Sequence, residues 1–459
     1  MLPIVTPLEM RTVDLAVSAD VATYIDRAGA AVARAAVRML GGTYGRTVHV
    51  IAGKGHNGDD GRVAARRLAD RGVKVRVFDV DQCPPVLPYA DLVIDAAYGT
   101  GFRGTWRPPA FATSGDRPLV LAVDIPSGVD ALTGVADGPV IPADRTVTFQ
   151  ALKPGLLLSP GRELAGDLEL VDIGLGDRVA QHTHAHLVQR SDVAAWLPLR
   201  PVDAHKWRAA VRVVAGSVGM TGAAALAARG AVRSGAGMVQ LSGVGTLVID
   251  APMEVVQKPL QGPGWSRALL HSLDRFHALV IGPGIGRDDA TAAETRAAVL
   301  EAALPAVVDG DALFAMAWNA EGAGALLRRR MRPTVLTPHD GEFALLTGQM
   351  PVADRFVSAR RLAADTQCVV LLKGATTVVA DPEGQVLVVT AGDERLASAG
   401  TGDVLAGIVG SLLAQGVEPL RAAAAAAWLH GRAAGSAPSA GFAAGDIPDR
   451  LPAVLEDLS

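Results

Sequence analysis

The chain has 459 residues, a net charge of −4, 49% hydrophobic residues and only 4% aromatic residues. This length predicts two to three domains, whose cores must consist mainly of Ala, Val and Leu. The charge balance excludes nonspecific nucleic-acid binding, and no uncharged apolar run reaches the ~18 residues of a membrane span.

The first third of the chain alternates short apolar segments with helical patterns. A long helical pattern covers 9–40, and a second helix is predicted at 61–72, ending at Gly72. Buried strands are predicted at 46–52, 73–80, 91–96 and 118–128. Alternation of this kind predicts a parallel, doubly wound sheet.

The pattern breaks at 191–207, a segment that contains two prolines. A second alternating series follows, with strands predicted at 211–217, 278–286, 305–313, 334–339 and 369–374. A run of six alanines at 422–427 predicts a buried helix. We therefore expect an α/β protein with two doubly wound α/β/α domains, at 1–195 and 205–459.

The segment GKGHNG (53–58) satisfies the G-x-G-x-x-G dinucleotide-binding pattern, and Asp79 follows at the end of the next strand. Asp59 and Asp60, however, occupy the first helical turn, where a pyrophosphate would rest. Their charges would repel it and favour a cation or a polar ligand. An NAD-dependent dehydrogenase is therefore the least favoured interpretation.

Oxygen-rich segments also follow two later strands, DAAYGTGFRG (95–104) and DIPSGVD (124–130). Ligands of doubly wound folds bind at the carboxyl ends of the strands. Together with YIDRAG (24–29) and GKGHNGDDG (53–61), these segments resemble the N-terminal domain of the NAD(P)H-hydrate epimerases. The resemblance implies a Rossmann-like epimerase domain.

The epimerase resemblance also implies residue roles. The hydrated nucleotide would contact His56, Asn57, Gly58, Asp59, Asp60, Gly99, Thr100, Gly101, Phe102, Arg103, Gly104 and Thr105. Asp124 would be the acid/base and ligand-binding residue, and Asn57, Asp95 and Ser127 would hold a potassium ion. Two residues depart from the family pattern. His56 replaces an Asn, and Asp59 replaces a Gly, which adds a charge where Gly tolerates more backbone conformations.

Four glycine-rich segments follow strands of the second domain: IGPGIG (281–286), TPHDGEF (337–343), KGATT (373–377) and AGTGDVLAGIVG (399–410). In small-molecule kinases of the ribokinase type, a glycine turn at a helix start is an anion hole, and the adjacent Asp activates the acceptor hydroxyl. Asp403, with Gly400 and Gly402, fits these roles. A simple N-cap is the alternative role for Asp403.

Most of residues 205–430 resemble the ADP-dependent NAD(P)H-hydrate dehydratases, a branch of the ribokinase-like superfamily. The resemblance implies that Ala236, Gly284, His339 and Asp403 contact the substrate. ADP would contact Lys373, Gly374, Ala375, Thr376, Thr377 and Gly402. Departures from the family pattern are Trp207, Asp340 and Thr401.

The two resemblances imply repair of hydrated NAD(P)H (NADHX and NADPHX). The first domain would interconvert the R and S epimers, and the second would dehydrate the S form with ADP and Mg²⁺, giving AMP and phosphate. K⁺ would support the epimerase. The alternative is a ribokinase-like small-molecule kinase with a non-catalytic N-terminal ligand-binding domain.

The positions of cysteine, histidine and arginine residues give further expectations about compartment, metal binding and surface. Cys83 and Cys368 form no zinc-binding spacing and favour a reducing compartment, so we expect a cytoplasmic protein. We also expect a homo-oligomer without membrane or nucleic-acid partners. His182, His184 and His186 would share one side of a strand, but no nearby acid or cysteine completes a metal site. The basic run at 328–332 is interpreted as a solvated helix end.

Overall fold

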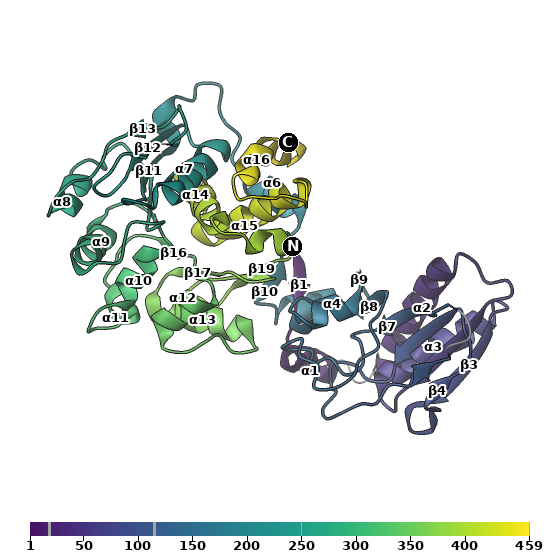
Figure 1. Ribbon diagram of the computed structural model, residues 1–459. Coiled ribbons are helices and arrows are strands. Elements are labelled where there is room, and N and C mark those ends of the chain that lie inside the picture. The colour runs from purple at the N-terminus through teal and green to yellow at the C-terminus, as the bar shows by residue number, and fades with distance from the viewer. Residues whose placement is uncertain (17–19, 113–115, 249, 459) are drawn as a thin grey trace. The chain divides into compact units, whose positions relative to one another are not determined.

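The computed structural model describes residues 1–16, 20–112, 116–248 and 250–458. The chain divides into two compact units, Leu2–Ala185 and His186–Ser459, with Met1 grouped with the second. Each unit contains a sheet flanked by helices (Figure 1). The division falls earlier in the chain than residue 195, the predicted end of the first domain.

The N-terminal unit consists of the following elements in chain order: β1 (Leu2–Ile4), α1 (Pro7–Ala16), α2 (Val21–Leu40), β2 (Thr47–Ala52), α3 (His56–Ala69), β3 (Lys74–Asp79), η2 (Val80–Gln82), β4 (Val86–Leu87), β5 (Leu92–Ala96), β6 (Ala110–Phe111), β7 (Leu119–Val123), β8 (Arg145–Phe149), η3 (Pro154–Leu156), α4 (Gly161–Ala165), β9 (Asp167–Val171) and α5 (Gly176–Ala180).

The main sheet of this unit has the order β3-β2-β5-β7-β8-β9, and every neighbouring pair is parallel. On one face, Val48 and Val50 pack with side chains of α2 and α3. On the other face, Ile51 and Val93 pack with Trp106 and other side chains of the segments between strands. Because both faces are covered, the central strands are continuous apolar runs rather than alternating ones.

The C-terminal unit consists of the following elements: β10 (Ala185–Leu187), which begins at the division, α6 (Arg190–Trp196), η4 (Lys206–Ala209), β11 (Ala210–Val214), α7 (Thr221–Arg233), β12 (Met238–Ser242), β13 (Val256–Gln257), α8 (Trp265–Leu270), β14 (Ala278–Ile281), α9 (Asp289–Glu301), β15 (Ala306–Val308), α10 (Asp311–Ala317), α11 (Ala323–Leu327), β16 (Thr334–Leu336), α12 (Asp340–Thr347), α13 (Arg355–Thr366), β17 (Val369–Leu372), β18 (Thr377–Ala380), β19 (Val386–Val389), η5 (Glu394–Ala397), α14 (Thr401–Ala414), α15 (Pro419–Ser436) and α16 (Asp446–Leu458).

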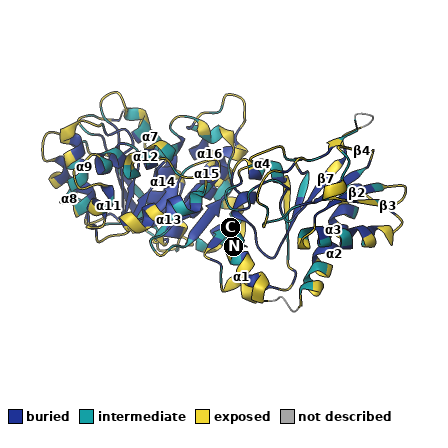
Figure 2. Ribbon diagram, turned by 90° about the horizontal axis from the view of Figure 1, so that it is seen from below, coloured by how far each residue is buried: buried dark blue, intermediate teal, exposed yellow. Residues whose placement is uncertain are grey.

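The strand order in this unit is β10-β19-β18-β17-β16-β15-β14-β11-β12-β13. The sheet is parallel from β17 to β13 and antiparallel where β18 pairs with β17 and β19. Helices α7, α14, α15 and α16 form one core layer, and α8 to α13 lie on the other side of the sheet (Figure 1). Buried strands between partly exposed helices are visible in Figure 2. The predicted doubly wound α/β architecture is confirmed.

The alanines at 422–427 lie in α15 and are buried, which confirms the predicted buried helix. Helix α3 begins at His56, before the helical pattern predicted at 61–72, and Asp59 lies in its first turn, as the sequence predicted. Gly58 also lies in this first turn. A Cβ at this position would lie 2.0 Å from the carbonyl oxygen of Gly53, so the first turn packs directly on the preceding loop.

Two other sequence interpretations need correction. The helical pattern at 9–40 is two helices, α1 and α2, and residues 17–19 lie outside the described part of the chain. The run at 328–332 is not fully solvated, because Arg330 is buried and donates hydrogen bonds to the carbonyls of Ala302 (3.0 Å) and Val299 near the end of α9. A cation at a helix C-terminus was expected, but the helix is α9 rather than α11.

Within the described ranges, no helix is both long enough and apolar enough to cross a membrane.

The core layer of the C-terminal unit depends on close contact between α7 and α14. A Cβ on Gly407 would lie 2.0 Å from the carbonyl oxygen of Ala227, and a Cβ on Gly230 would lie 2.4 Å from that of Val404. Side chains at these positions would push the helices apart. Because α14 begins at Thr401, this packing also fixes the position of the predicted catalytic segment.

We predict that Gly407→Ala lowers the free energy of unfolding of the C-terminal unit by about 1–3 kcal/mol, because the added methyl group forces α7 and α14 apart. The matched control is Gly222→Ala in α7, where no atom lies within 4 Å of the added Cβ. This control should leave stability unchanged or raise it by up to about 1 kcal/mol. Urea denaturation of both variants is the measurement, and equal effects would contradict the packing argument.

Candidate active sites

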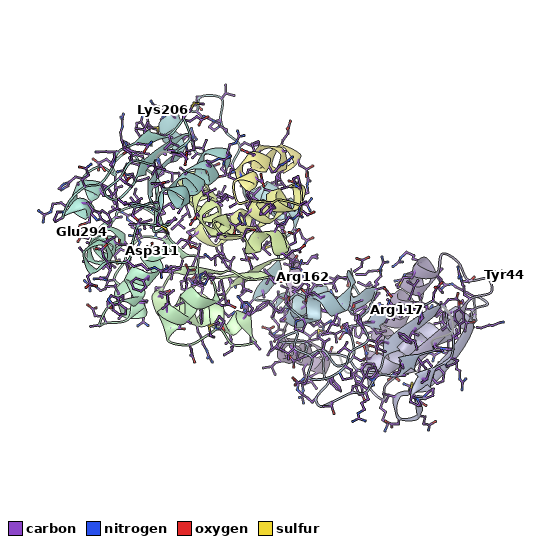
Figure 3. The ribbon with its side chains drawn as sticks, in the orientation of Figure 1. Tyr44, Arg117, Arg162, Lys206, Glu294 and Asp311 are labelled. Carbon is purple, nitrogen blue, oxygen red and sulfur yellow. The ribbon has the colours of Figure 1, made fainter. Side chains whose placement is uncertain are left out.

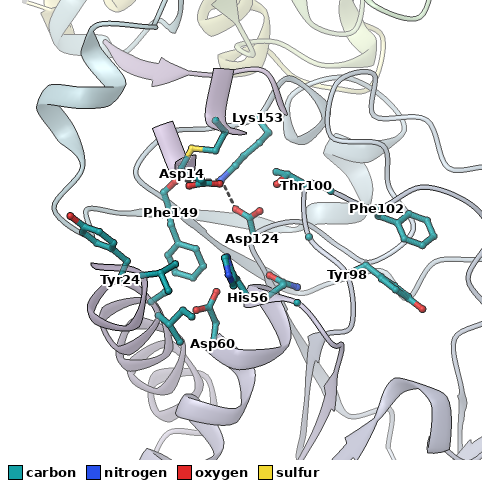
Figure 4. A pocket seen from close by; sticks show the side chains of 18 of the residues that line it. Asp14, Tyr24, His56, Asp60, Tyr98, Thr100, Phe102, Asp124, Phe149 and Lys153 are labelled. Carbon is teal, nitrogen blue, oxygen red and sulfur yellow. Dashed lines mark hydrogen bonds and ion pairs between the residues drawn. The ribbon is translucent and has the colours of Figure 1, made fainter. Parts of the chain in front are cut away.

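A cavity of about 650 Å³ lies within the N-terminal unit (Figure 4). Its walls come from α1, α2, the start of α3 and the segments that follow β5, β7 and β8. The carboxyl ends of these parallel strands meet at one edge of the sheet, which is where doubly wound folds bind ligands. The predicted substrate residues that line it are His56, Asn57, Asp60, Gly99, Thr100, Gly101, Phe102, Arg103 and Asp124.

Four other predicted substrate residues, Gly58, Asp59, Gly104 and Thr105, are not among the lining residues. Asp59 forms an ion pair with Arg62 (3.4 Å) on the surface of α3. It has helical backbone and is not among the residues with positive φ. The strain expected from replacing Gly at this position is therefore absent, and the added charge is partly compensated by Arg62.

Asp124 stands directly after β7 and faces the cavity. Its φ is +68°, in the left-handed region that Asp tolerates better than most residues. Its Oδ1 atom accepts hydrogen bonds from Thr148 Oγ1 (3.1 Å) and from the ammonium of Lys153. Lys153 is only 2% exposed. Figure 4 shows Asp124 between this lysine and His56.

Asp60 lies on the cavity wall formed by α3 and is 7% exposed. Burial raises the pKa of Asp60 to about 8, and the charges of Asp124 and Asp59 act in the same direction. Lys153 opposes this effect. Asp14 of α1 lines the same cavity, and its pKa is also raised, by burial and by the charge of Asp124. The cavity therefore combines an ion-paired carboxylate with carboxyl groups that favour the neutral form.

The predicted potassium ligands lie at neighbouring strand ends. Asp95 is fully buried at the end of β5 and accepts hydrogen bonds from the hydroxyl (2.6 Å) and amide (2.9 Å) of Ser127. The Nδ2 atom of Asn57 is buried and has no partner among the described residues. Since amide nitrogen and oxygen are assigned rather than observed, a rotated Asn57 would present its oxygen instead. Asp95 and Ser127 are thus in direct contact, and their role in binding potassium with Asn57 stays a prediction.

In the C-terminal unit, Lys373 follows β17 and is surrounded by acids from two other strand ends. Its Nζ atom lies 3.0 Å from Asp309 Oδ1, after β15, and 3.5 Å from Glu342 Oε2, in α12. Asp309 is 2% exposed and also accepts a hydrogen bond from Thr337 Oγ1 (2.7 Å). Burial alone would lower the pKa of Lys373, but the charges of Asp309 and Glu342 raise it. The lysine therefore stays cationic.

Asp403 lies in the first turn of α14, close to this cluster. A Cβ on Gly402 would lie only 3.3 Å from Lys373 Nζ, and Gly400 has a φ of +90° just before the helix. Burial raises the pKa of Asp403 to about 7, assisted by the charge of Asp309 and opposed by that of Lys373. Asp403 is not the N-cap, since Gly400 holds that position.

Gly284 and His339, two other predicted residues of this site, follow β14 and β16. Gly284 has a φ of +62°, and its carbonyl accepts a hydrogen bond from Ser217 Oγ (2.9 Å). His339 is the N-cap of α12. Ala236 instead precedes β12, next to Gly235, where an added Cβ would touch the side chain of Gln415 at the C-terminal end of α14. The structure therefore does not bring Ala236 to the cluster around Asp403, which lies in the first turn of that helix. The predicted ADP residues Lys373, Gly374, Ala375, Thr376 and Thr377 connect β17 to β18.

The backbone between β17 and β18 is held from outside by Arg355. This guanidinium donates to the carbonyl of Lys373 (2.8 Å) and forms two bonds to the Asp340 carboxylate (2.8 and 3.1 Å). Asp340, a departure from the family pattern, thus pairs with Arg355 and does not disturb the loop.

Sequence reasoning missed several residues of both sites. Lys153 and Asp14 belong to the first cavity, and Asp309 and Glu342 belong to the cluster around Lys373. A signal for Asp309 was present, because it is an acid directly after a buried strand, in the segment VVDGD. Asp311, two residues further on and labelled in Figure 3, is ion-paired with Arg287 (2.6 Å) rather than with Lys373.

Comparisons with known proteins agree with this arrangement. Residues 211–455 match the NAD(P)H-hydrate dehydratase family, and residues 22–88 and 79–155 match the family described as YjeF-related protein N-terminus. A relative named bifunctional NAD(P)H-hydrate repair enzyme, from Moorella thermoacetica, is 37% identical over 90% of this chain and 88% of its own length.

Two solved structures are similar to the C-terminal unit. A ribokinase-like superfamily protein from Enterococcus faecalis has a TM-score of 0.52 at 20% identity, over 60% of this chain and 97% of its own, and shows the fold. The ADP/ATP-dependent NAD(P)H-hydrate dehydratase from Bacillus subtilis, co-crystallised with ATP and Mg²⁺, has a TM-score of 0.51 at 30% identity, over 59% of this chain and 98% of its own.

Fold and sites together define a two-domain α/β enzyme with a Rossmann-like N-terminal unit and a ribokinase-like C-terminal unit. Within that class, the chain belongs to the family of bifunctional NAD(P)H-hydrate repair enzymes. The family resemblance inferred from the sequence is confirmed. The roles of the individual residues stay predictions.

The raised pKa of Asp60 can be tested directly. We predict that Asp124→Asn lowers the pKa of Asp60 from about 8, because it removes a neighbouring negative charge. A Lys153→Met change should raise it, because Lys153 opposes the shift. Carboxyl ¹³C NMR titration is the measurement, with Asp60→Asn used to assign the signal. An Asp60 pKa insensitive to both changes would show that these charges do not act on it.

Proposed function

We propose that this enzyme repairs hydrated NAD(P)H in two steps, epimerisation in the N-terminal unit and ADP-dependent dehydration of the S form in the C-terminal unit. The observation that carries the proposal is the position of Asp403, in the first turn of α14 and next to the Lys373 cluster. This is the arrangement that transfer of a phosphoryl group to a hydroxyl requires.

In the dehydration step, Asp403 accepts the proton of the ring hydroxyl, and the hydroxyl oxygen attacks the β-phosphorus of ADP, so that AMP leaves. Hydroxide is a poor leaving group, whereas the phosphate ester is a good one. The lone pair of the ring nitrogen then expels phosphate, and loss of a proton from the adjacent ring carbon restores NAD(P)H. The released phosphate takes up the ring-carbon proton and the hydroxyl proton passes from Asp403 to solvent, so the hydrated nucleotide and ADP give NAD(P)H, AMP, phosphate and one proton.

Charge on the transferred group is stabilised by this chain's own donors. The amides of Gly402 and Asp403 have no backbone acceptor among the described residues, as expected for the first turn of a helix. Lys373 adds a cation beside them. Asp309 and Glu342 offer carboxylate oxygens that suit Mg²⁺, which supplies further neutralisation of phosphate charge when bound.

In the epimerisation step, Asp124 is the proposed acid/base, because its carboxylate faces a cavity of suitable size. The two activities are complementary: a site that accepts one configuration at the hydroxylated carbon repairs half of a mixed pool, and an epimerase makes the other half available. The proposal also includes a potassium ion at Asn57, Asp95 and Ser127, assembly into a homo-oligomer and a cytoplasmic location.

The decisive experiment incubates a mixed-epimer NADHX pool with the enzyme, ADP and Mg²⁺ and follows NADH absorbance. Full conversion supports both activities. A plateau near half, when spontaneous epimerisation is slow, supports the dehydratase and a non-catalytic N-terminal unit. A stable phosphorylated product without NADH would instead identify the alternative, a ribokinase-like small-molecule kinase. ATP in place of ADP tests the identity of the donor.

We predict that Asp403→Asn lowers the rate of dehydration by at least about 100-fold, because the amide cannot accept the hydroxyl proton. The epimerase activity of the same chain is the internal control for folding and should not change. A variant rate close to that of the wild type would mean that another residue is the base.

Dehydration should also depend on pH. Asp403 is an acid whose pKa is raised to about 7, so the carboxylate, the form able to accept a proton, gains population as the pH rises. We predict a rate that increases roughly tenfold per pH unit well below pH 7 and levels off above it. Initial rates at saturating ADP, with substrate stability checked at each pH, give the profile. A profile that is flat through this range would contradict the assignment.

A further inference from the structure

Lys153 is the most deeply buried ionisable group of the N-terminal cavity, and neither proposed reaction uses it so far. It follows the end of β8 and lines the cavity opposite α3. Burial of an ammonium at 2% exposure is strongly unfavourable unless its charge and all its protons are compensated. The hydrogen-bond partners of Lys153 therefore indicate its role in the cavity.

All three protons of the Lys153 ammonium have acceptors within the protein. These acceptors are Asp124 Oδ1, Thr148 Oγ1 (2.8 Å) and the carbonyl oxygen of Phe149 (3.3 Å). An ammonium has three donors and no acceptor. Lys153 therefore has no proton left to offer a ligand, and a direct acid role is not supported.

The same contacts fix the Asp124 carboxylate. Thr148 Oγ1 accepts from Lys153 and donates to Asp124 Oδ1, so both residues hold one oxygen of the carboxylate. Asp124 Oδ2 has no hydrogen-bond partner among the described residues. Figure 4 shows the Lys153 contact on one side of the carboxylate, with the other side open toward the cavity.

We propose that Lys153, assisted by Thr148, is a positioning residue of the epimerase reaction, which directs the Oδ2 atom of Asp124 to the substrate. The proposal rests on the epimerase function proposed above. Charge supports it as well, because the ammonium of Lys153 forms an ion pair with the Oδ1 atom of Asp124 and thereby holds the carboxylate in place.

The test compares Lys153→Met, Lys153→Arg and Thr148→Val in the full chain, with R-NADHX as substrate and epimerisation coupled to the chain's own dehydratase. Methionine keeps the length of the side chain and removes the charge. For Lys153→Met we expect kcat of epimerisation to fall by about 100-fold or more, with KM changed by less than about threefold. Lys153→Arg should recover part of kcat, and Thr148→Val should lose about tenfold.

Lys74→Met, an exposed lysine of β3 outside the cavity, is the matched control and should keep wild-type kcat. Thermal unfolding checks that each variant is folded. If Lys153→Met fails to fold, Lys153→Arg and Thr148→Val decide, and wild-type kcat in both overturns the proposal. Wild-type kcat in a folded Lys153→Met variant also overturns it while leaving the epimerase function intact. Absence of epimerisation in the wild type removes the proposed function itself.

Discussion

In each unit, a lysine ammonium compensates for carboxylates that a parallel sheet gathers at the carboxyl ends of its strands. Lys153 pairs with Asp124 in the first unit, and Lys373 lies within 3.5 Å of both Asp309 and Glu342 in the second. Buried carboxylates are unfavourable without such partners. The chemistry proposed for both sites depends on these ion pairs, because they hold the carboxylates in place beside the proposed reacting groups.

The acids without such a partner behave differently. Asp60 and Asp403 form no ion pair among the described residues, and burial raises their pKa values to about 8 and about 7. Near neutral pH, a modest change in environment is enough to protonate or deprotonate them. Each site therefore contains a fixed charge next to a group that exchanges protons readily, which is the usual requirement for general acid–base catalysis.

Much of this organisation was predictable from the sequence. Continuous apolar runs identified the central strands, and glycine-rich segments after them identified the edge where the sites lie. Residues such as Lys153 and Glu342 were not predictable, because their roles depend on contacts between distant elements. The need for glycine at position 58 was not predictable either, because it follows from the close approach of the first turn of α3 to the carbonyl of Gly53.

The left-handed backbone of Asp124 has a consequence for the history of this enzyme family. At a φ of +68°, Gly, Asn and Asp are the residues that fit with least strain. In a relative that has lost the reaction, we expect Asp124 to be replaced first by Asn or Gly, because these residues preserve the turn. Relatives with Asn or Gly at this position would then be recognisable as folded binding proteins without the reaction, rather than as proteins that no longer fold.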